Sequence, residues 1–328
     1  MFEKTDSKKR PVVCLTMITA LLCSACASPP LSYLDQEAPG VVPELFAVGV
    51  VNTDAIELNA VFHPDGSEFF FTRVIDGDFT MHRCVYRDGA WSEPEALLLY
   101  PGGEPALAVD MAVSPDGQSL YFLGRFPSSL SPENPGLDLW VSQRQGQGWG
   151  TASLVPHPVS TEAAEFYPCV VADGSLYYVS DGPGSLGSTD IVRAQRLSDG
   201  SFGEPQNLGA PVNSVSGEGD TFVAPDESYM ILTSSRPGGL GQGDLYVSFR
   251  QPGGSPAQGA TWSEPQNLGA LINSKHTDFC PMVSPDGKLL FFTRRYGNTW
   301  ETSERCEIYW LDASYLDPFR WVHIAGSP

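Results

Sequence analysis

Five copies of one short pattern recur along the chain, and they constrain its fold more than any other feature. Each copy joins two apolar segments through a Pro-Asp-Gly turn or a close variant of it. Proline presets φ for a turn, aspartate caps the turn, and glycine accepts the positive φ at which the next strand begins. The central aspartates are Asp65, Asp116, Asp173, Asp226 and Asp286, which lie 51, 57, 53 and 60 residues apart.

The residues that follow each turn predict two further strands. An acidic residue such as Asp138 or Asp244 opens a third strand, and segments such as Trp91-Ser92-Glu93-Pro94 mark a fourth strand in most copies. Four short strands in a unit of about fifty residues are typical of a propeller blade. We therefore predict an all-β fold, a single β-propeller over residues 41–328 with five blades of four antiparallel strands. Six blades is the alternative.

The repeat resembles the Pro-Asp-Gly subtype of WD40-like propeller repeats, the type found in TolB-like proteins. The resemblance covers residues 41–328, although the third copy lacks the proline and the fourth lacks the glycine. The additional α/β domain of TolB proteins has no counterpart in this sequence. The resemblance implies a propeller fold along almost the whole chain.

A partial copy precedes the first full one and predicts how the ring closes. Asn52-Thr53, Asn213-Ser214 and Asn273-Ser274 each begin thirteen residues before a repeat aspartate. Residues 41–53 therefore resemble the end of a blade. We expect this segment to supply the outer strand of the last blade, which leaves no free sheet edge.

The first residues are typical of an export signal. Lys8, Lys9 and Arg10 precede an apolar segment, residues 12–22, that is too short to span a bilayer. Residues 22–26 resemble a bacterial lipobox, which implies cleavage after residue 25 and lipidation of Cys26. The Ala25-Cys26-Ala27 triplet also fits the cleavage rule for a soluble product. We favour a lipoprotein, with residues 1–25 as signal peptide and 26–40 as tether. Because residue 27 is alanine, we expect the periplasm or the cell surface, at the outer membrane.

The charge of the chain excludes one class of partner. The formal net charge is −20, and the sequence has no basic stripe that could displace counterions from a nucleic acid. We expect a monomer that contacts the membrane only through its lipid. An envelope protein or a glycan is the expected partner.

Four cysteines remain in the predicted propeller, and their spacing does not fit a zinc site. They are Cys84, Cys169, Cys280 and Cys306, for which three disulfide pairings are open. Buried thiols, or one pair, is the interpretation we favour.

Charged side chains are expected to gather where each innermost strand begins. The first strand of a blade lines the channel, and its start lies at the face opposite the Pro-Asp-Gly turn. Eight residues before the repeat aspartate stand Glu57, Ala108, Glu165, Glu218 and Asp278. Six residues before it stand Asn59, Asp110, Tyr167, Asp220 and Cys280. Because positions two apart share one side of a strand, we expect every blade to place a carboxylate at one mouth of the channel.

Arginines in the loops after the second strands are expected at the same mouth, with Asp181 replacing arginine in the third copy. One hypothesis pairs each arginine with the acidic residue that opens the third strand, as Arg236 with Asp244. The candidate binding residues are Glu165, Tyr167, Glu218, Asp220, Asp278, Arg73, Arg125, Arg236 and Arg294.

Three roles are open for the carboxylates. They can bond N–H groups of the loops, or they can hold Ca²⁺, Mg²⁺ or a cationic group of a partner, because crowded carboxylates repel one another. The candidate metal ligands are Glu57, Glu165, Glu218 and Asp278. No other cofactor is expected.

The third role is catalysis by two carboxylates at a glycosidase-like site. The candidates are Glu57, Asp110 and Glu165, with Tyr167 and Trp300 as platforms for a sugar. No Ser-His-Asp arrangement or histidine metal spacing accompanies them. We therefore predict a cell-envelope binding or scaffold propeller without catalysis, which holds a protein or glycan at the acidic channel face. The alternatives are a glycan-active enzyme and a purely structural envelope component.

Overall fold

The computed structural model describes residues 1, 33–100, 107–128, 130, 136–251, 261–297, 299 and 303–325. The chain divides into two units, Met1–Pro30 and Leu31–Pro328, and the second contains the propeller. The predicted signal peptide and the predicted lipidation site, Cys26, lie outside the described residues. Within those residues, no helix is both long and apolar enough to cross a membrane.

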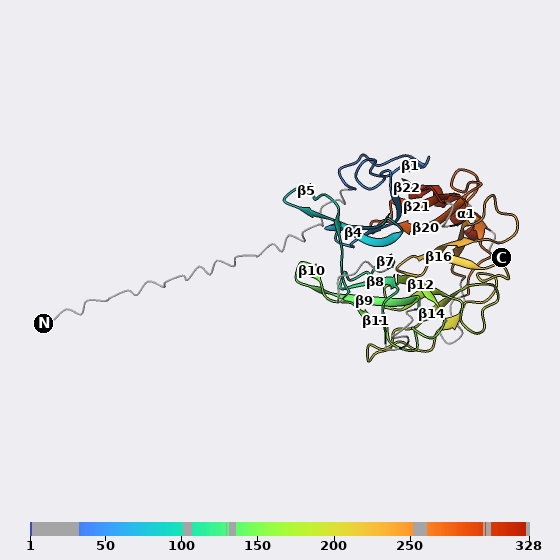
Figure 1. Ribbon diagram of the computed structural model, residues 1–328, viewed down its shortest axis with the longest axis horizontal. Helices are drawn as coiled ribbons and strands as arrows, with labels where there is room; N and C mark the ends of the chain where they lie inside the picture. The colour runs from blue at the N-terminus through green and yellow to red at the C-terminus, as the bar shows by residue number, and fades with distance from the viewer. Residues whose placement is uncertain are drawn as a thin grey trace. The chain divides into compact units, whose positions relative to one another are not determined.

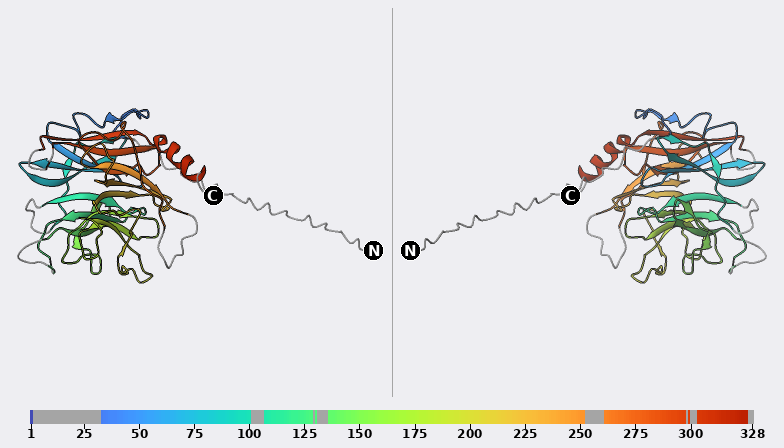
Figure 2. Two further views of the ribbon diagram at one scale, coloured as in Figure 1. Left: turned by 90° about the vertical axis from the view of Figure 1, so that its right-hand side faces the viewer. Right: turned by 90° about the vertical axis from the view of Figure 1, so that its left-hand side faces the viewer.

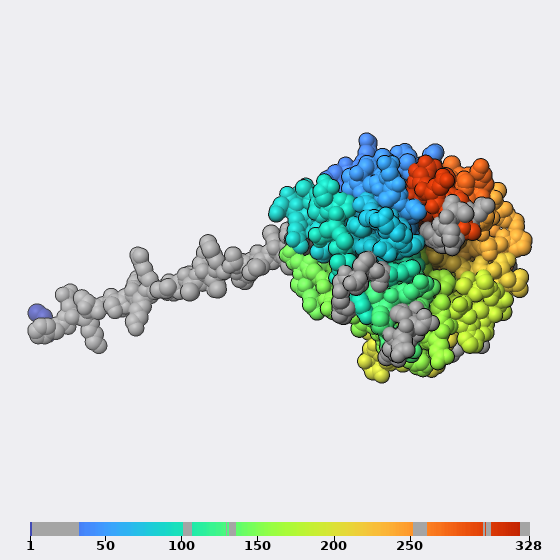
Figure 3. Space-filling model, viewed as in Figure 1, coloured from blue at the N-terminus to red at the C-terminus, as the bar shows by residue number. Residues whose placement is uncertain are grey.

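The second unit folds into five antiparallel sheets, which confirms the predicted five-bladed propeller. Figure 1 shows the sheets in chain order around a common centre, and the colours of Figure 3 follow the same order around the surface. Blade 1 contains β2 (Ile56–Phe62), β3 (Glu68–Ile75), β4 (Asp78–Arg87), β5 (Ala90–Trp91) and β6 (Glu95–Ala96). Blade 2 contains β7 (Ala108–Val113), β8 (Ser119–Gly124), β9 (Asp138–Gln145), β10 (Gly148–Trp149) and β11 (Ser153–Leu154).

The other three blades have four strands each. Blade 3 contains β12 (Glu165–Val170), β13 (Leu176–Ser180), β14 (Asp190–Ala194) and β15 (Gln206–Asn207). Blade 4 contains β16 (Glu218–Val223), β17 (Tyr229–Ser234), β18 (Asp244–Phe249) and β19 (Gln266–Asn267). Blade 5 contains β20 (Thr277–Val283), β21 (Leu289–Tyr296), β22 (Arg305–Asp312) and β1 (Glu44–Leu45).

The second strand of a blade is apolar on both faces because neighbouring blades cover both. In β3, Phe69 and Phe71 pack with Phe291 and Trp310 of blade 5. Phe70, between them, packs with Phe122 of blade 2. Successive side chains of a strand point to opposite faces, so an unbroken aromatic run suits a strand between two blades. Full burial of each such ring contributes about 1.5–3 kcal/mol.

The N-terminal segment closes the ring as predicted. Strand β1 pairs with β22, with Glu44 opposite Trp310 and Leu45 opposite Tyr309. The buried Asn52 side chain donates to the carbonyl oxygens of Phe46, at 2.6 Å, and Ile308, at 2.8 Å, and it accepts from Ile308 N–H at 2.9 Å. One amide side chain therefore joins the first residues of the propeller to its last blade.

A C-terminal helix, which the sequence did not lead us to expect, follows the last blade. The 3₁₀ turn η1 (Ala313–Leu316) is capped by the Asp312 carboxylate and continues into α1 (Asp317–Ala325). Figure 2 shows α1 at the margin of the propeller. The Arg320 guanidinium stacks over the Tyr229 ring at 4.8 Å, which holds the helix against blade 4.

The fourth repeat lacks its glycine because the side chain at that position bonds to the neighbouring blade. Glu227 adopts a φ of 56°, which a side chain rarely takes. Its carboxylate accepts from Tyr177 at 2.8 Å, from Arg193 at 2.8 Å and from Arg250 at 2.6 Å. These charge-assisted bonds to blade 3 and within blade 4 offset the backbone strain.

All four propeller cysteines are free and buried, which agrees with the interpretation as buried thiols. Burial raises the pKa of the Cys169 thiol to about 11 and that of the Cys306 thiol to about 12. Neutral thiols of this kind are poor nucleophiles and poor metal ligands.

We predict that Asn52→Ala lowers the free energy of unfolding by about 2–3 kcal/mol, because it leaves buried backbone groups of Phe46 and Ile308 without partners. Urea unfolding of the propeller measures the change. The matched control is Val48→Ala in the same segment, where the side chain is 68% exposed. We expect that control to stay within about 0.5 kcal/mol of the parent. Equal stability of the parent and Asn52→Ala would contradict the closure described above.

Candidate functional site

The carboxylates eight residues before the repeat aspartate are structural in their immediate contacts. Each is buried and accepts from the backbone N–H of the serine or threonine four residues earlier. In three blades the hydroxyl of the same residue donates as well, at 2.5 Å for Thr53, 2.5 Å for Thr161 and 2.7 Å for Ser214. This is the predicted role in bonding loop N–H groups, and it holds for Glu57, Glu165, Glu218 and Asp278.

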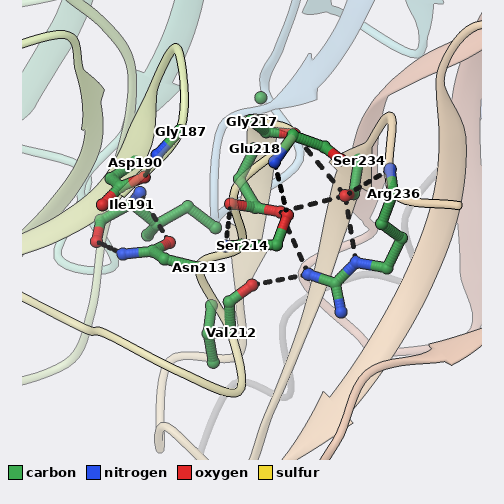
Figure 4. Close-up of polar contacts among 12 residues, drawn as sticks. Gly187, Asp190, Ile191, Val212, Asn213, Ser214, Gly217, Glu218, Ser234 and Arg236 are labelled. Atoms are coloured by element: carbon green, nitrogen blue, oxygen red, sulfur yellow. Dashed lines mark hydrogen bonds and ion pairs between the residues drawn. The ribbon is translucent and has the colours of Figure 1, made fainter. Parts of the chain in front are cut away.

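Arginine neutralises this carboxylate in blades 1, 4 and 5. Arg73 Nε lies 2.9 Å from Glu57, Arg236 Nη2 lies 3.1 Å from Glu218, and Arg294 Nε lies 2.6 Å from Asp278. Each guanidinium also donates to a carbonyl of the preceding loop, as Arg236 does to Val212 at 2.6 Å. Figure 4 shows this arrangement around Glu218.

The predicted pair of Arg236 with Asp244 is wrong. Asp244 instead accepts from the backbone N–H of Leu240, at 2.6 Å, and of Gly241, at 2.9 Å, and from the Asn267 amide at 2.9 Å. The acidic residue at the start of the third strand therefore stabilises the loop that precedes it. Arg236 pairs instead with Glu218, the carboxylate of the first strand.

Blade 2 has alanine at this position, Ala108, and its arginine has no carboxylate to meet. Arg125 is exposed and forms no ion pair within the described part of the chain. Blade 3 shows the opposite case. It has the carboxylate of Glu165, but it has no arginine at the position that Arg236 occupies in blade 4.

Glu165 is 1% exposed and, among the described residues, is in no ion pair. Burial raises its pKa to about 7, and the negative charges of Asp138 and Asp181 add to the rise, while the bonds from Thr161 oppose it. Asp138 is itself 2% exposed, and burial raises its pKa too. Two buried acids without a cation thus lie where blades 2 and 3 meet.

The residues two positions further along face the propeller axis, because a bulge interrupts every innermost strand. Each pairing register shifts at this point, for example between Leu58 and Val61, and between Glu218 and Thr221. In four blades the bulged residue has a positive φ of 50–63°. A bulge inserts one extra residue and so changes the side of the strand to which the next side chains point. The prediction that positions two apart share one side of the strand is therefore wrong at this point.

The five bulge residues, Asn59, Asp110, Tyr167, Asp220 and Cys280, form an axial ring that links the blades. Asn59 accepts from Asp110 N–H at 3.3 Å and donates to Cys280 Sγ at 3.2 Å. The backbone N–H of Cys280 donates to Asp220 at 3.0 Å, and the Tyr167 hydroxyl donates to the Pro281 carbonyl oxygen at 3.4 Å. The ring therefore crosses the channel with bonds between blades.

The two carboxyl groups of the axial ring share one environment. Burial and the negative charge of Asp220 raise the pKa of Asp110 well above its usual value. Burial also raises the pKa of Asp220, but the bonds from Cys280 limit the rise. We therefore expect Asp110 to hold the proton of the pair and Asp220 to carry the charge.

The structure thus separates the candidate residues into two groups. Asp110, Tyr167 and Asp220 meet at the axis, whereas Glu165, Glu218 and Asp278 stay within their own blades with any arginine they have. Of the proposed catalytic residues, Glu57 and Glu165 are buried, and only Asp110 is partly exposed. Trp300, the proposed sugar platform, lies outside the described residues. No group of three or more His, Cys, Asp or Glu side chains suited to a metal is present among the residues described.

A socket that the sequence analysis missed opens at the other face of the channel. It is a cavity of about 190 Å³ to which every blade contributes residues from the end of its innermost strand and, in four blades, the turn proline. Its lining is Val61, Phe62, Pro64, Ala112, Val113, Pro115, Cys169, Val170, Phe222, Val223, Pro225, Met282, Val283 and Pro285. None of these side chains carries a charge. The repeated apolar residues just before each turn were the signal for it.

A larger groove of about 710 Å³ adjoins the socket. Phe222, Pro225, Val283 and Pro285 line both cavities, so the two form one concave surface. The groove runs between blades 4 and 5, and Arg250 and Arg320 contribute its cationic groups.

Comparison with known proteins does not assign a family. Neither a protein-family model nor a curated protein matches the sequence. Among solved structures, the chain is similar to putative TolB from Agrobacterium tumefaciens, with a TM-score of 0.49, 16% identity, and coverage of 76% of this chain and 73% of that one.

Two glycoside hydrolases are also among the similar solved structures. The catalytic domain of the family-62 α-L-arabinofuranosidase of Coprinopsis cinerea has a TM-score of 0.47 and 11% identity, with coverage of 84% of this chain and 95% of that chain. A thermostable family-43 glycoside hydrolase has a TM-score of 0.47 and 13% identity, with coverage of 84% and 90%. At identities of 11–16% these likenesses assign no function to the chain.

We predict that Glu165 makes stability fall with pH. A carboxyl whose pKa is raised in the folded state contributes stability below its usual pKa, here 4.5, and loses it as the pH rises through about 7. The free energy of unfolding of the parent, relative to Glu165→Gln, is therefore expected to fall by about 3 kcal/mol between pH 4.5 and pH 8. Urea unfolding at several pH values measures this difference.

The matched control is Glu218→Gln in blade 4. It leaves the Arg236 guanidinium without its carboxylate, so we expect this variant to be less stable than the parent at pH 8. At the same pH, Glu165→Gln is expected to be more stable than the parent. A pH-independent difference between the parent and Glu165→Gln would show that folding does not raise the pKa of Glu165.

Proposed function

We propose that this chain is a cell-envelope binding propeller that holds a protein partner at its Pro-Asp-Gly face, with one apolar side chain of that partner in the socket. The observation that supports the proposal most strongly is the socket lining, to which all five blades contribute and which contains no charged side chain. A closed ring places these residues around one point with little freedom to collapse.

The size and chemistry of the socket favour a protein side chain over a glycan. The socket alone, at about 190 Å³, is smaller than the usual 300–1,000 Å³ of small-molecule sites and suits one side chain, while the adjoining groove of about 710 Å³ can take the chain that bears it. A sugar would lose hydrogen bonds of its hydroxyl groups against an apolar wall, which is unfavourable. A leucine or an aromatic side chain would instead gain about 1.5–3 kcal/mol by burial, as anchors of protein interfaces do.

The adjoining groove indicates where the rest of the partner's chain would lie after it leaves the socket. Arg250 and Arg320 line the groove together with Asp226. Arg250 pairs with Glu227 and Arg320 with Asp317, and each guanidinium has further N–H donors for acidic or carbonyl groups of a chain that leaves the socket. Arg320 is part of α1 and is positioned by its stacking on Tyr229. The proposed partner segment therefore carries an apolar anchor followed by an acidic or polar stretch.

Export and lipidation at Cys26 complete the proposal, since they place a binding propeller on a tether beside the membrane. Lipobox-like residues 22–26 and the linker-like sequence after them support this part. Metabolic labelling with palmitate, with Cys26→Ser as the unlabelled control, tests it. Labelling of both proteins would contradict it.

We predict that filling the socket abolishes partner binding. Peptides selected on the mature chain from a displayed random library are expected to share an apolar anchor, and Ala112→Phe is expected to weaken their binding at least tenfold. Fluorescence anisotropy measures the affinity, and circular dichroism checks the fold. The matched control, Val215→Trp, adds bulk to an 86% exposed position near the start of β16, at the opposite face. We expect its affinity to be unchanged.

Two results would count against this function. Selected peptides whose affinity is unaffected by Ala112→Phe would place binding elsewhere. Turnover of aryl glycosides by the parent, lost in Asp110→Asn and in Asp220→Asn, would favour the second candidate, glycoside hydrolysis. The raised pKa of the Asp110 and Asp220 pair is the observation that favours that candidate, because such a reaction needs one protonated and one ionised carboxyl group.

A further inference from the structure

Two loops of the propeller have the same sequence pattern and differ at one informative position. Residues 180–190 read Ser-Asp-Gly-Pro-Gly-Ser-Leu-Gly-Ser-Thr-Asp, and residues 234–244 read Ser-Ser-Arg-Pro-Gly-Gly-Leu-Gly-Gln-Gly-Asp. Ser180 lies opposite Glu165 in its blade, and Ser234 lies opposite Glu218 in the next. Gly182 of blade 3, and not Asp181 as predicted from the sequence, therefore takes the place of Arg236 of blade 4.

The loops also fold alike, so the comparison holds in three dimensions. Leu186 N–H donates to Asp190 at 2.8 Å, as Leu240 N–H does to Asp244 at 2.6 Å. The Gly187 and Gly241 N–H groups donate to the same two carboxylates, at 3.3 Å and 2.9 Å. The loss of arginine in blade 3 is thus a local change in an otherwise conserved arrangement of backbone.

In blades 1, 4 and 5 a guanidinium bridges two acceptors. One acceptor is the buried carboxylate and the other is a carbonyl oxygen of the loop before the innermost strand. Blade 4 uses the Val212 carbonyl and blade 5 uses that of Ile272, each fourteen residues before the repeat aspartate. The same position in blade 3 is Val159, whose carbonyl oxygen, within the described residues, accepts a 3.4 Å bond from the Tyr178 hydroxyl and none from an arginine.

Blade 3 keeps both acceptors and supplies no cation. Among the described residues Glu165 accepts bonds from Thr161 alone, and the charged groups that act on it are acids, Asp138 and Asp181. Asp138 also lacks the amide that its counterparts use, because Leu154 stands where Asn207 and Asn267 bond Asp190 and Asp244. A buried carboxylate without a counter-charge costs several kcal/mol, so a proton or a cation is strongly favoured here.

A side chain at the missing position needs a small shift of one neighbour. Among the described residues, a Cβ built on Gly182 meets Ser180 Oγ at 3.1 Å, which is tight, and Ala163 Cβ at 3.5 Å, which is ordinary contact. Asp181 and Pro183 on either side of Gly182 are exposed, so the place of the missing arginine adjoins the surface.

We propose that blade 3 is a receptor site for a guanidinium group, and that an arginine side chain of a partner protein pairs with Glu165 in the place that Arg236 fills in blade 4. Three copies of the same bridge inside the chain identify the chemical class of the ligand. The planar guanidinium group can donate to one carboxylate and one carbonyl oxygen at the same time. A compact ammonium group fits this pair of acceptors less well. The formal charge of −20 attracts a basic partner from a distance. This site lies at the start of β12, away from the socket, and does not rest on the proposed function.

The experiment uses the mature chain and L-argininamide at pH 7.5, with L-lysinamide at matched ionic strength as the control ligand. We expect argininamide to raise the midpoint of thermal unfolding of the parent by at least about 2 °C in a saturable way, since it binds the folded state. Lysinamide is expected to give a clearly smaller shift. An equal response to the two ligands would overturn the assignment to guanidinium.

Paired variants locate the site. Gly182→Arg supplies the guanidinium from within, so it is expected to be more stable than the parent and to lose the response to argininamide. Arg236→Gly creates the same vacancy in blade 4 and is expected to be less stable and to respond more strongly. Glu165→Gln is expected to fold and to lose the response, which keeps the test decisive if Gly182→Arg does not fold.

Two outcomes would overturn the proposal. A response in Arg236→Gly without one in the parent would show that the place beside Glu165 is closed. A response in Gly182→Arg equal to that of the parent would place the ligand elsewhere. Ala112→Phe is expected to keep the response to argininamide. The test of partner binding at the socket and the test of the guanidinium site at Glu165 can therefore fail independently.

Discussion

The bond between a buried carboxylate and the serine or threonine four residues before it is the interaction on which much of this propeller depends. It ties the loop from the preceding blade to the start of the next innermost strand in four of the five blades. Because that strand begins at a set point, the bulge that follows points one side chain per blade at the axis. The arginine bridge then holds the same carboxylate from the other side in blades 1, 4 and 5.

This constraint divides the channel into zones of different chemistry. At one end, the carboxylates bond to the loops before the innermost strands. Among the described residues, the carboxylate of blade 3 is the one that has no cation. In the middle, the axial ring links blades through Asn59, Asp220 and Cys280. At the Pro-Asp-Gly end, the strand ends leave an apolar socket. A ring with a bonded centre and an open apolar end is better suited to holding a partner than to passing a ligand through its channel.

Much of the fold follows from local sequence, since a turn between two apolar strands is specified by neighbours in the chain. The five repeats and the sheet order were predictable for that reason. The closure of the ring was predictable from the partial copy over residues 41–53, whereas the bonds of Asn52 that hold it were not. The bulge was not, because alternation is a rule for regular strands and one extra residue reverses it. The partner of Arg236 was not predictable either, since Glu218 and Asp244 are both within reach in a sequence and only the loop geometry assigns Asp244 to backbone N–H groups.

The departures from the repeat were more informative than the repeat itself. Glu227 in place of glycine ties blade 4 to blade 3, and Gly182 in place of arginine leaves Glu165 without a cation. The sequence showed that the fourth copy lacks its glycine and that the third copy lacks an arginine, but it placed the latter change at Asp181. The meaning of both exceptions depends on contacts between residues far apart in the chain. The socket was missed for a related reason, because five short apolar segments become one surface only when the ring closes.

The central claim is that Glu165 is a buried carboxyl whose arginine is missing. The most direct test is an NMR titration of its side-chain carboxyl carbon in the parent and in Gly182→Arg. A midpoint near 7 in the parent, which falls below the usual 4.5 when the arginine is supplied, is the predicted result. A midpoint at or below 4.5 in the parent would contradict the claim, because it would mean that a counter-charge is already in place.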